Sequence, residues 1–127
     1  FEEFIGTAFR GGEGQFFTPR NVVQMMIDVL LPTSGERVID PACGSGGFLA
    51  YIAKHFSHTK AKNTFLAGIE KDAFLSRLAK IYLALLGQKN YSVFCENSLE
   101  QPTKWQTETQ SNIELGTFDV VLTNPPF

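Results

Sequence analysis

The apolar positions follow two repeats along the chain, one typical of helices and one typical of strands. Apolar residues at i, i+3, i+4 and i+7 predict helices over residues 1–9, about 19–31, 46–56 and 73–86. Short apolar runs bounded by turn residues predict strands over residues 36–40, 64–69, 91–95 and 118–123. Because these strands alternate with helices, the order predicts an α/β fold with a parallel sheet and right-handed crossovers.

Residues at the predicted helix ends have the chemistry of caps. Thr18 before Pro19 is typical of an N-cap followed by proline at the first helical position, and Pro32 ends that helix. Asp72 is expected to cap the helix over 73–86, and Gly87 stands where a C-cap glycine belongs. The stripes expected to face the core in these two helices are Val22, Val23, Met26, Ile27 and Leu30, and Phe74, Leu75, Leu78, Tyr82, Leu83 and Leu86.

The segment between the last two strands has a different composition. Residues 101–112 are rich in glutamine and threonine, and we interpret them as an exposed loop.

Composition limits the class of protein. The chain has 127 residues, of which 43% are apolar, and this predicts one globular domain. Eleven Lys and Arg against 13 Asp and Glu leave no cationic excess for a phosphate backbone. Any binding to nucleic acid is therefore expected to involve other regions.

Other features of the composition bear on location and on metals. No apolar run is long enough to cross a membrane, and Glu2, Glu3 and Arg10 interrupt the first residues, so a cytoplasmic protein is predicted. Cys43 and Cys95 form no CxxC pair and are expected to be reduced thiols, with no metal site.

A glycine-rich segment, DPACGSGGF at residues 40–48, follows the first predicted strand and opens the next helix. Glycines let the backbone approach a ligand closely, and a helix N-terminus presents free N–H groups. Leu49 replaces the third glycine of GxGxxG and no GK[ST] pattern follows, so a dinucleotide or a triphosphate is disfavoured. Glu70 ends the next strand at about the 20-residue spacing from which a carboxylate reaches a ribose diol. Together they indicate a nucleoside site, unless Glu70 is only a solvated strand-end carboxylate.

A second motif, NPPF at residues 124–127, follows the last predicted strand. Two consecutive prolines remove two N–H donors and fix two φ angles, which leaves outward carbonyls as acceptors. The Asn124 oxygen and the Pro125 carbonyl could accept the two N–H bonds of an exocyclic amino group and direct its lone pair at an electrophile. Phe127 offers a face on which a base can stack. The structural alternative is a proline turn with a core phenylalanine.

Four segments in this order resemble a known family. QFFTP at residues 15–19, DPACGSGGF, Glu70 and NPPF are similar to motifs X, I, II and IV of the gamma-order amino-methyltransferases, in particular the HsdM-type modification subunit of type I restriction-modification systems. The resemblance implies a partial Rossmann-like methyltransferase fold with strand order 3-2-1-4. It also implies transfer of a methyl group from S-adenosylmethionine to N6 of adenine in DNA.

The resemblance assigns residues to the cofactor. The positions it implies are Gln15, Phe17, Thr18, Pro19, Asp40, Ala42, Gly44, Gly46, Glu70, Lys71 and Asn97. Asp40 would face the amino group of the cofactor, Glu70 would bind the ribose hydroxyls and Lys71 would flank the adenine. Asn97 stands where the family often has an aspartate, and it still offers an acceptor oxygen to the adenine amino group.

The resemblance also assigns the catalytic residues. Asn124, Pro125, Pro126 and Phe127 would hold the target adenine, which must leave the duplex stack to reach them. Residues 1–127 would form the N-terminal part of the catalytic domain, with the approach helix and motif X in 1–19 and the cofactor-binding half in 20–127. The family's later strands and its target-recognition surface would lie elsewhere, so little methylation is expected from these residues alone. Double-stranded DNA and specificity and restriction subunits are the implied partners.

Other functions remain open from the sequence. Related enzymes methylate guanine N2 in RNA or glutamine side chains, but those families commonly have NPPY and lack QFFTP. A non-catalytic module that holds the cofactor or supports a partner subunit is a second alternative. A nicotinamide oxidoreductase is a third, and the missing third glycine argues against it.

Overall fold

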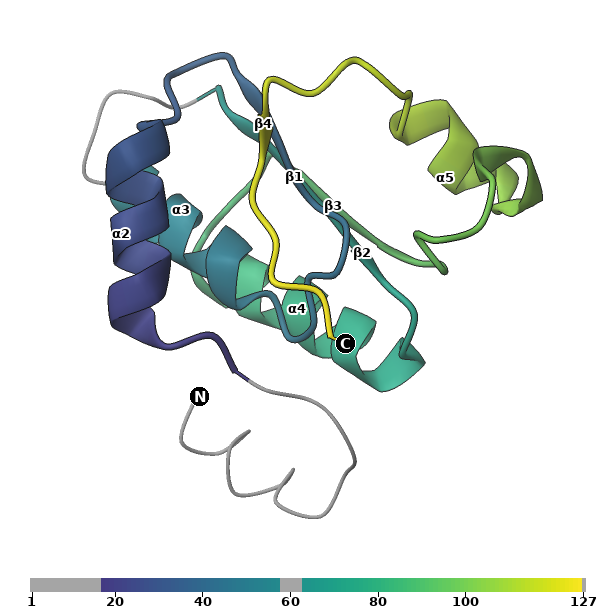
Figure 1. The fold of residues 1–127 in the computed structure, drawn as a ribbon, viewed down its shortest axis with the longest axis horizontal. Helices are drawn as coiled ribbons and strands as arrows, with labels where there is room; N and C mark the ends of the chain where they lie inside the picture. The colour runs from purple at the N-terminus through teal and green to yellow at the C-terminus, as the bar shows by residue number, and fades with distance from the viewer. Residues whose placement is uncertain (1–16, 58–62, 127) are drawn as a thin grey trace.

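A computed structural model describes residues 17–57 and 63–126, which form a parallel sheet flanked by helices (Figure 1). The elements, in chain order, are α2 (Arg20–Leu30), β1 (Arg37–Asp40), α3 (Gly47–Ser57), β2 (Phe65–Glu70), α4 (Ala73–Leu85), β3 (Tyr91–Cys95), a 3-10 turn (Pro102–Lys104), α5 (Thr107–Asn112) and β4 (Val120–Val121). The helix expected over residues 1–9 lies outside the described residues. None of the helices in the described part has the length and apolar character needed to cross a bilayer.

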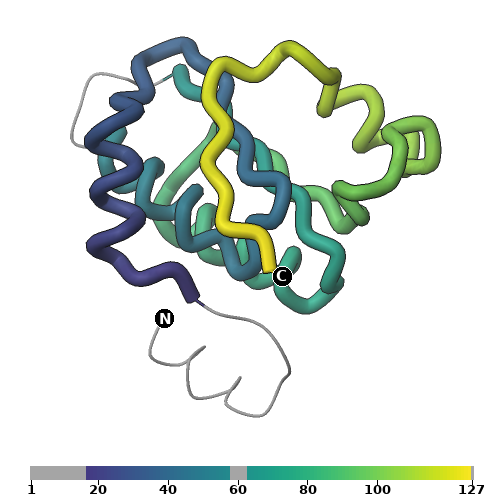
Figure 2. The backbone as a smooth tube through the Cα atoms, in the orientation of Figure 1, coloured from purple at the N-terminus to yellow at the C-terminus, as the bar shows by residue number. Residues whose placement is uncertain are grey.

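The strand order is β3-β2-β1-β4 and all three pairings are parallel, which confirms the predicted order. β4 is shorter than the expected strand over 118–123, since only Val120 and Val121 pair with β1. Backbone hydrogen bonds extend the contact by one residue each way, from Asp119 N to Arg37 O and from Leu122 N to Ile39 O. In Figure 2 this last segment, in yellow, runs beside β1 toward one end of the sheet.

Alternate residues of each strand face opposite sides of the sheet. One side packs against α2, α3 and α4 through Val38, Leu66, Val93 and Val120. The other side carries Ile39, Ala67, Ile69 and Phe94 beneath Trp105 and Ile113. Figure 1 shows α5 lying apart from the other helices, so the segment around it covers the second face.

The predicted stripes on α2 and α4 are confirmed only in part. Val23 and Ile27 are buried, whereas Val22 and Leu30 are exposed. On α4, Leu75, Tyr82 and Leu83 are buried as expected, but Phe74 is 54% exposed. α4 also buries Ser76 and Ala79, and side chains this small bring the helix close to its neighbours, which shifts the buried face away from Phe74.

The α4 caps are confirmed. The Asp72 carboxylate accepts hydrogen bonds from Phe74 N and Leu75 N, both at 2.9 Å. At the other end Gly87 has φ +71°, and Gln88 N donates to Leu83 O, the pattern that closes a helix with a left-handed glycine.

The prediction for the start of α2 is wrong. Pro19, not Thr18, occupies the N-cap position, and no side chain of the described residues caps the helix. The helix begins one residue later because the Pro19 carbonyl accepts the first hydrogen bonds, from Val22 N and Val23 N. Thr18 has a different partner, described below.

The prediction of an exposed loop over residues 101–112 is also wrong. It contains the 3-10 turn and α5, and Trp105 between them is 6% exposed. The Glu96 carboxylate accepts from Gln106 N at 2.7 Å and from Thr109 Oγ1 at 3.0 Å, so a residue just after β3 caps α5. Trp105 Nε1 donates to Asn97 O at 2.9 Å, which fixes the indole over the sheet.

Candidate active site

The carboxyl ends of the strands bring together several of the predicted site residues. Asp40 ends β1, Glu70 ends β2, and Asn97 and Asn124 follow β3 and β4. Parallel strands place these ends at one edge of the sheet, where ligands bind in open α/β folds. Two predicted residues, Gln15 and Phe127, lie outside the described part of the chain.

Glu70 joins the glycine loop to the start of α4. Its Oε2 accepts from Gly44 N at 2.9 Å, and its Oε1 accepts from Asp72 N at 2.8 Å. A carboxylate has about four acceptor sites, so each oxygen can accept one more hydrogen bond. The two backbone donors therefore fix the orientation of Glu70 while leaving it able to accept from a diol.

The glycines of the loop serve different purposes. Gly44 and Gly46 have φ +53° and +87°, in the left-handed region that favours glycine. A Cβ on Gly44 would meet nothing within 4 Å, so the space beside it is open. A Cβ on Gly46 would lie 3.0 Å from Ala79 Cβ, which gives Gly46 a packing reason against α4. Its expected cofactor contact stays a prediction.

Gly68, in the middle of β2, lies beneath this loop and was not singled out in the sequence. A Cβ there would come within 2.8 Å of both Cys43 Sγ and Leu49 Cδ1. The loop is also tied to β2 by Cys43 N, which donates to Ile69 O at 3.0 Å. The only sequence signal was a glycine inside a strand pattern, which marks a close approach by another segment.

Asp40 is a buried carboxylate with an unused oxygen. The residue is 1% exposed, Oδ1 accepts from Ala42 N at 3.1 Å, and Oδ2 has no hydrogen-bond partner among the described residues. Burial raises the pKa of Asp40 to about 6, and the negative charge of Glu70 adds to the rise. The Ala42 N–H and the nearby Thr123 hydroxyl lower the pKa of Asp40, although Thr123 Oγ1 forms no hydrogen bond with a described residue. Such an oxygen fits a cationic donor such as an ammonium group.

Asn124 is exposed on the turn after β4, and its Nδ2 donates to Thr18 Oγ1 at 3.1 Å. The bond joins the segment before α2 to the segment after β4, 106 residues apart. Pro125 and Pro126 are exposed beside it, as are Phe17 and Pro19. The structure thus brings the described parts of QFFTP and NPPF together, a contact that helix-capping rules did not predict.

The expected cofactor role of Asn97 stays a prediction. Its side-chain oxygen accepts from Leu99 N at 3.1 Å, the geometry of an ordinary turn, and its carbonyl accepts from Trp105. Lys71 is exposed and its carbonyl accepts a weak hydrogen bond from Cys95 Sγ at 3.6 Å. Cys43 and Cys95 are free thiols as predicted, and burial raises the pKa of Cys43 well above its usual value.

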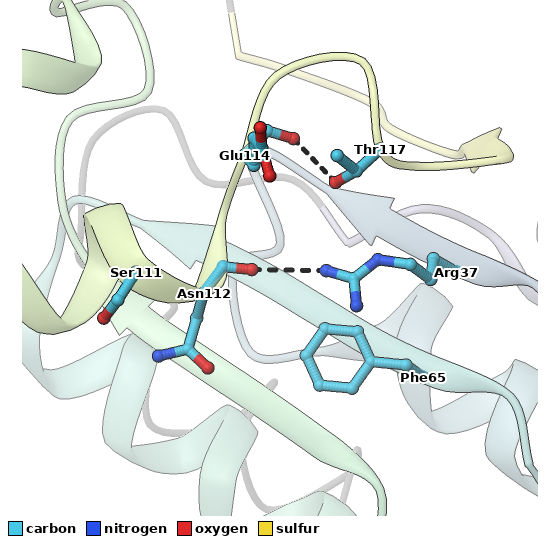
Figure 3. Close-up of a pocket in the computed structure, with 6 residues that line it drawn as sticks. All are labelled: Arg37, Phe65, Ser111, Asn112, Glu114 and Thr117. Carbon is cyan, nitrogen blue, oxygen red and sulfur yellow. Dashed lines mark hydrogen bonds between the residues drawn. The ribbon is translucent and has the colours of Figure 1, made fainter.

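A cavity of about 370 Å³ lies at the opposite edge of the sheet (Figure 3). Its lining residues are Arg37, Phe65, Ser111, Asn112, Glu114 and Thr117. The Arg37 guanidinium lies 4.7 Å from the ring centroids of both Phe65 and Phe118, and Nη2 donates to Asn112 O at 3.3 Å. These contacts hold the end of α5 against the sheet, and none of them involves a predicted site residue.

The fold agrees with that of the proteins to which the chain is similar. A sequence profile described as N-6 DNA methylase matches residues 2–127. The chain belongs to this family. It is 32% identical over 127 residues to the type I restriction enzyme EcoEI methylase subunit of Escherichia coli, covering 92% of this chain and 24% of that protein. It is 30% identical over 119 residues to the HindI methylase subunit of Haemophilus influenzae, covering 90% and 24%. The chain thus spans about a quarter of the length of these relatives.

Solved structures show the same fold. A modification subunit from Vibrio vulnificus has a TM-score of 0.77 at 33% identity, covering 99% of this chain and 27% of that one. A type I restriction-modification methyltransferase subunit from Streptococcus thermophilus has a TM-score of 0.78 at 25% identity, covering 99% and 26%. A class I S-adenosylmethionine-dependent methyltransferase from Listeria monocytogenes is 18% identical, and its TM-score of 0.69 shows a shared fold alone. These likenesses confirm the predicted Rossmann-like fold class.

Proposed function

We propose that the protein transfers a methyl group from S-adenosylmethionine to the N6 amino group of adenine in DNA, as the modification subunit of a type I restriction-modification system. The single observation that carries the proposal is the position of Asn124. It stands on a proline turn at the carboxyl end of β4, at the edge of the sheet where Asp40 and Glu70 end the next two strands. Membership of the N-6 DNA methylase family supports the choice of acceptor.

The residues at this edge fit the cofactor. S-adenosylmethionine supplies a methyl group on a positively charged sulfur, which makes that carbon electrophilic. Asp40 would accept from the cofactor's ammonium group, because Oδ2 is buried without a described partner. Glu70 would accept from the ribose hydroxyls, and the open space beside Gly44 lets the backbone approach the ligand.

Asn124 and Pro125 would act on the adenine amino group. The lone pair of this nitrogen is delocalised into the ring, which makes it a poor nucleophile. Two acceptors, Asn124 Oδ1 and the Pro125 carbonyl, would take its two N–H bonds and favour a pyramidal nitrogen. Attack by this nitrogen would form the nitrogen–carbon bond as the sulfur–carbon bond breaks, and the nitrogen would then release a proton to solvent. Positioning and charge stabilisation suffice, without a general base.

The remaining expectations belong to the same proposal. Pro126 would keep the turn rigid and Phe127 would stack on the base. Residues 1–127 would supply the cofactor-binding part of the catalytic domain, because the chain spans about a quarter of its relatives. The net charge of this chain is −2, so contacts with double-stranded DNA would come from other regions and from a specificity subunit. A restriction subunit would be a further partner. The complex would act in the cytoplasm.

The test uses the full-length protein, with its specificity subunit where it needs one. Duplex DNA is incubated with S-adenosylmethionine, digested to nucleosides and analysed by mass spectrometry for N6-methyladenine. Asn124→Ala is expected to lower the rate about 100-fold or more, the usual cost of removing one group that stabilises a transition state. Cofactor affinity, measured by calorimetry with NAD as the control ligand, is expected to stay unchanged. Asn90→Ala, at an exposed asparagine before β3, is the matched control.

Two outcomes would contradict the proposal. Methylation of guanine or of a protein glutamine, with no N6-methyladenine, would point to the related amino-methyltransferases. An Asn124→Ala protein with unchanged activity would show that this turn takes no part in the reaction.

A further inference from the structure

The hydroxyl of Thr18 has a partner that neither helix capping nor cofactor binding explains. Asn124 Nδ2 donates to Thr18 Oγ1 at 3.1 Å, and within residues 17–57 and 63–126 no side chain caps α2. The hydroxyl therefore makes no contribution to the helix that follows it. The hydroxyl contacts Asn124, the side chain that we propose accepts a hydrogen bond from the target amino group.

Thr18 is held in place by the helix that begins two residues later. The carbonyl of Pro19 accepts from Val22 N at 3.0 Å and from Val23 N at 3.1 Å. Val23 and Ile27 anchor the same helix in the core, where both are buried. Thr18 thus lies two residues before a helix that is anchored in the core.

A primary amide has two chemically opposite ends. Its NH₂ group donates two hydrogen bonds and its oxygen accepts two, so a rotation of the amide by 180° exchanges donor and acceptor. The adenine amino group is itself a donor. If Asn124 presented its NH₂ group to the adenine amino group, two donors would face each other. The hydrogen bond on which the proposed mechanism depends would then be lost. In the structure it is Nδ2 that faces Thr18 Oγ1, at 3.1 Å, which leaves Oδ1 to accept from another donor.

We propose that Thr18 is a positioning residue for methyl transfer: its hydroxyl holds the NH₂ end of Asn124 and turns Oδ1 toward the target amino group. The inference rests on the proposed function and deepens it. It gives Thr18 a role in the chemical step, separate from the cofactor contact that the family resemblance implies for the same position.

The experiment compares two substitutions in the full-length protein. Thr18→Val keeps the shape of the side chain and removes the acceptor, whereas Thr18→Ser keeps the hydroxyl. Thr18→Val is expected to lower kcat about tenfold at saturating cofactor, with KM for DNA and cofactor affinity within about twofold of wild type. Thr18→Ser is expected to retain kcat within about threefold. The melting temperature is expected to be the same for all three proteins.

A double variant tests whether the two residues act together. If Thr18 acts only through Asn124, Thr18→Val is expected to lower kcat no further in an Asn124→Ala background. A full additional tenfold loss there would overturn the inference. So would a wild-type kcat for Thr18→Val, or weaker cofactor binding with unchanged kcat, which would make Thr18 a cofactor contact.

A spectroscopic measurement separates this inference from the proposed function. With asparagine labelled by ¹⁵N, the side-chain NH₂ resonances of Asn124 are identified as the pair lost in Asn124→Ala. They are expected to shift in Thr18→Val and not in Thr18→Ser, and an absence of any shift would overturn the contact itself. If the wild-type protein forms no N6-methyladenine, the proposed function fails, whatever these resonances show.

Discussion

The two ends of the sheet use their polar groups in different ways. At the amino end the Arg37 guanidinium lies over the rings of Phe65 and Phe118 and donates to Asn112 O, whereas its buried Nε has no described partner. At the carboxyl end, the buried oxygens Asp40 Oδ2 and Thr123 Oγ1 have no described partner. Asn124 stands in solvent there. Internal contacts stabilise the first end, whereas the second has buried oxygens without a described partner.

This difference teaches where to look for function. The cavity of about 370 Å³ lies at the amino end, but its lining is already engaged in holding α5 to the sheet. Buried acceptors without partners cost stability in the absence of a ligand, so their presence at one end is the stronger signal. Substitutions at the two ends should therefore affect different quantities.

The largest expected effect is on cofactor affinity at the carboxyl end. Glu70→Ala removes the acceptor for Gly44 N and the acceptor that we propose for the ribose hydroxyls, and is expected to weaken binding of S-adenosylmethionine about 100-fold. Calorimetry on the full-length protein measures the change. Glu100→Ala, at an exposed glutamate, is the matched control and is expected to bind as wild type. Equal affinities of Glu70→Ala and Glu100→Ala for S-adenosylmethionine would contradict the difference drawn between the two ends of the sheet.

A smaller effect is expected on stability at the same end. The pKa of Asp40 is raised to about 6, so the folded protein keeps a proton that the unfolded chain releases near pH 4, and this stability is lost as the pH rises from about 4 to 6. Asp40→Asn is expected to remove that slope and to raise the free energy of unfolding at pH 7.5 by about 2 kcal/mol without cofactor. Urea denaturation at pH 5 and pH 7.5 measures both.

The same variant is expected to lose affinity for the cofactor. A bound ammonium group favours the charged carboxylate, so binding to the wild type should tighten as the pH rises through 6, and Asp40→Asn should not show this dependence. Asp28→Asn, at an exposed aspartate on α2, is the control. A variant both less stable at pH 7.5 and unchanged in affinity would show that Asp40 is only a structural residue.

The smallest effect is expected at the amino end. Arg37→Met keeps much of the apolar stem but loses the cation–π contacts and the bond to Asn112 O, at a cost of about 1 kcal/mol in unfolding free energy. Cofactor affinity is expected to stay unchanged. Arg77→Met, on the exposed face of α4, should change neither quantity. A loss of cofactor affinity in Arg37→Met would mean that the two ends are coupled.

Local rules predicted much of this fold from the sequence. Periodicity and caps located the helices because Asp72 and Gly87 act within a few residues of their own chain position. The parallel pairing followed from the alternation of strands and helices, and the strand order from the family resemblance. The ends of β1 and β2 then placed Asp40 and Glu70 at one edge of the sheet.

Contacts between distant segments could not be predicted in this way. α5 forms in a glutamine- and threonine-rich stretch because Glu96, outside the helix, accepts from Gln106 N just before it and from the Thr109 hydroxyl within it. Trp105 also packs on the far face of the sheet. Thr18 looked like a cap because its local sequence fits one, but Asn124 lies 106 residues away. The unused oxygen of Asp40 likewise depends on packing that no local pattern contains.

The two hydrogen bonds accepted by Glu70 also predict how this edge opens. Gly44 N and Asp72 N belong to different crossovers, yet each donates to an oxygen of the same carboxylate. Displacement of that side chain exposes both amides to solvent at once. Their protons should therefore exchange with deuterium through one shared opening event, and a ligand that fixes Glu70 should slow both by the same factor.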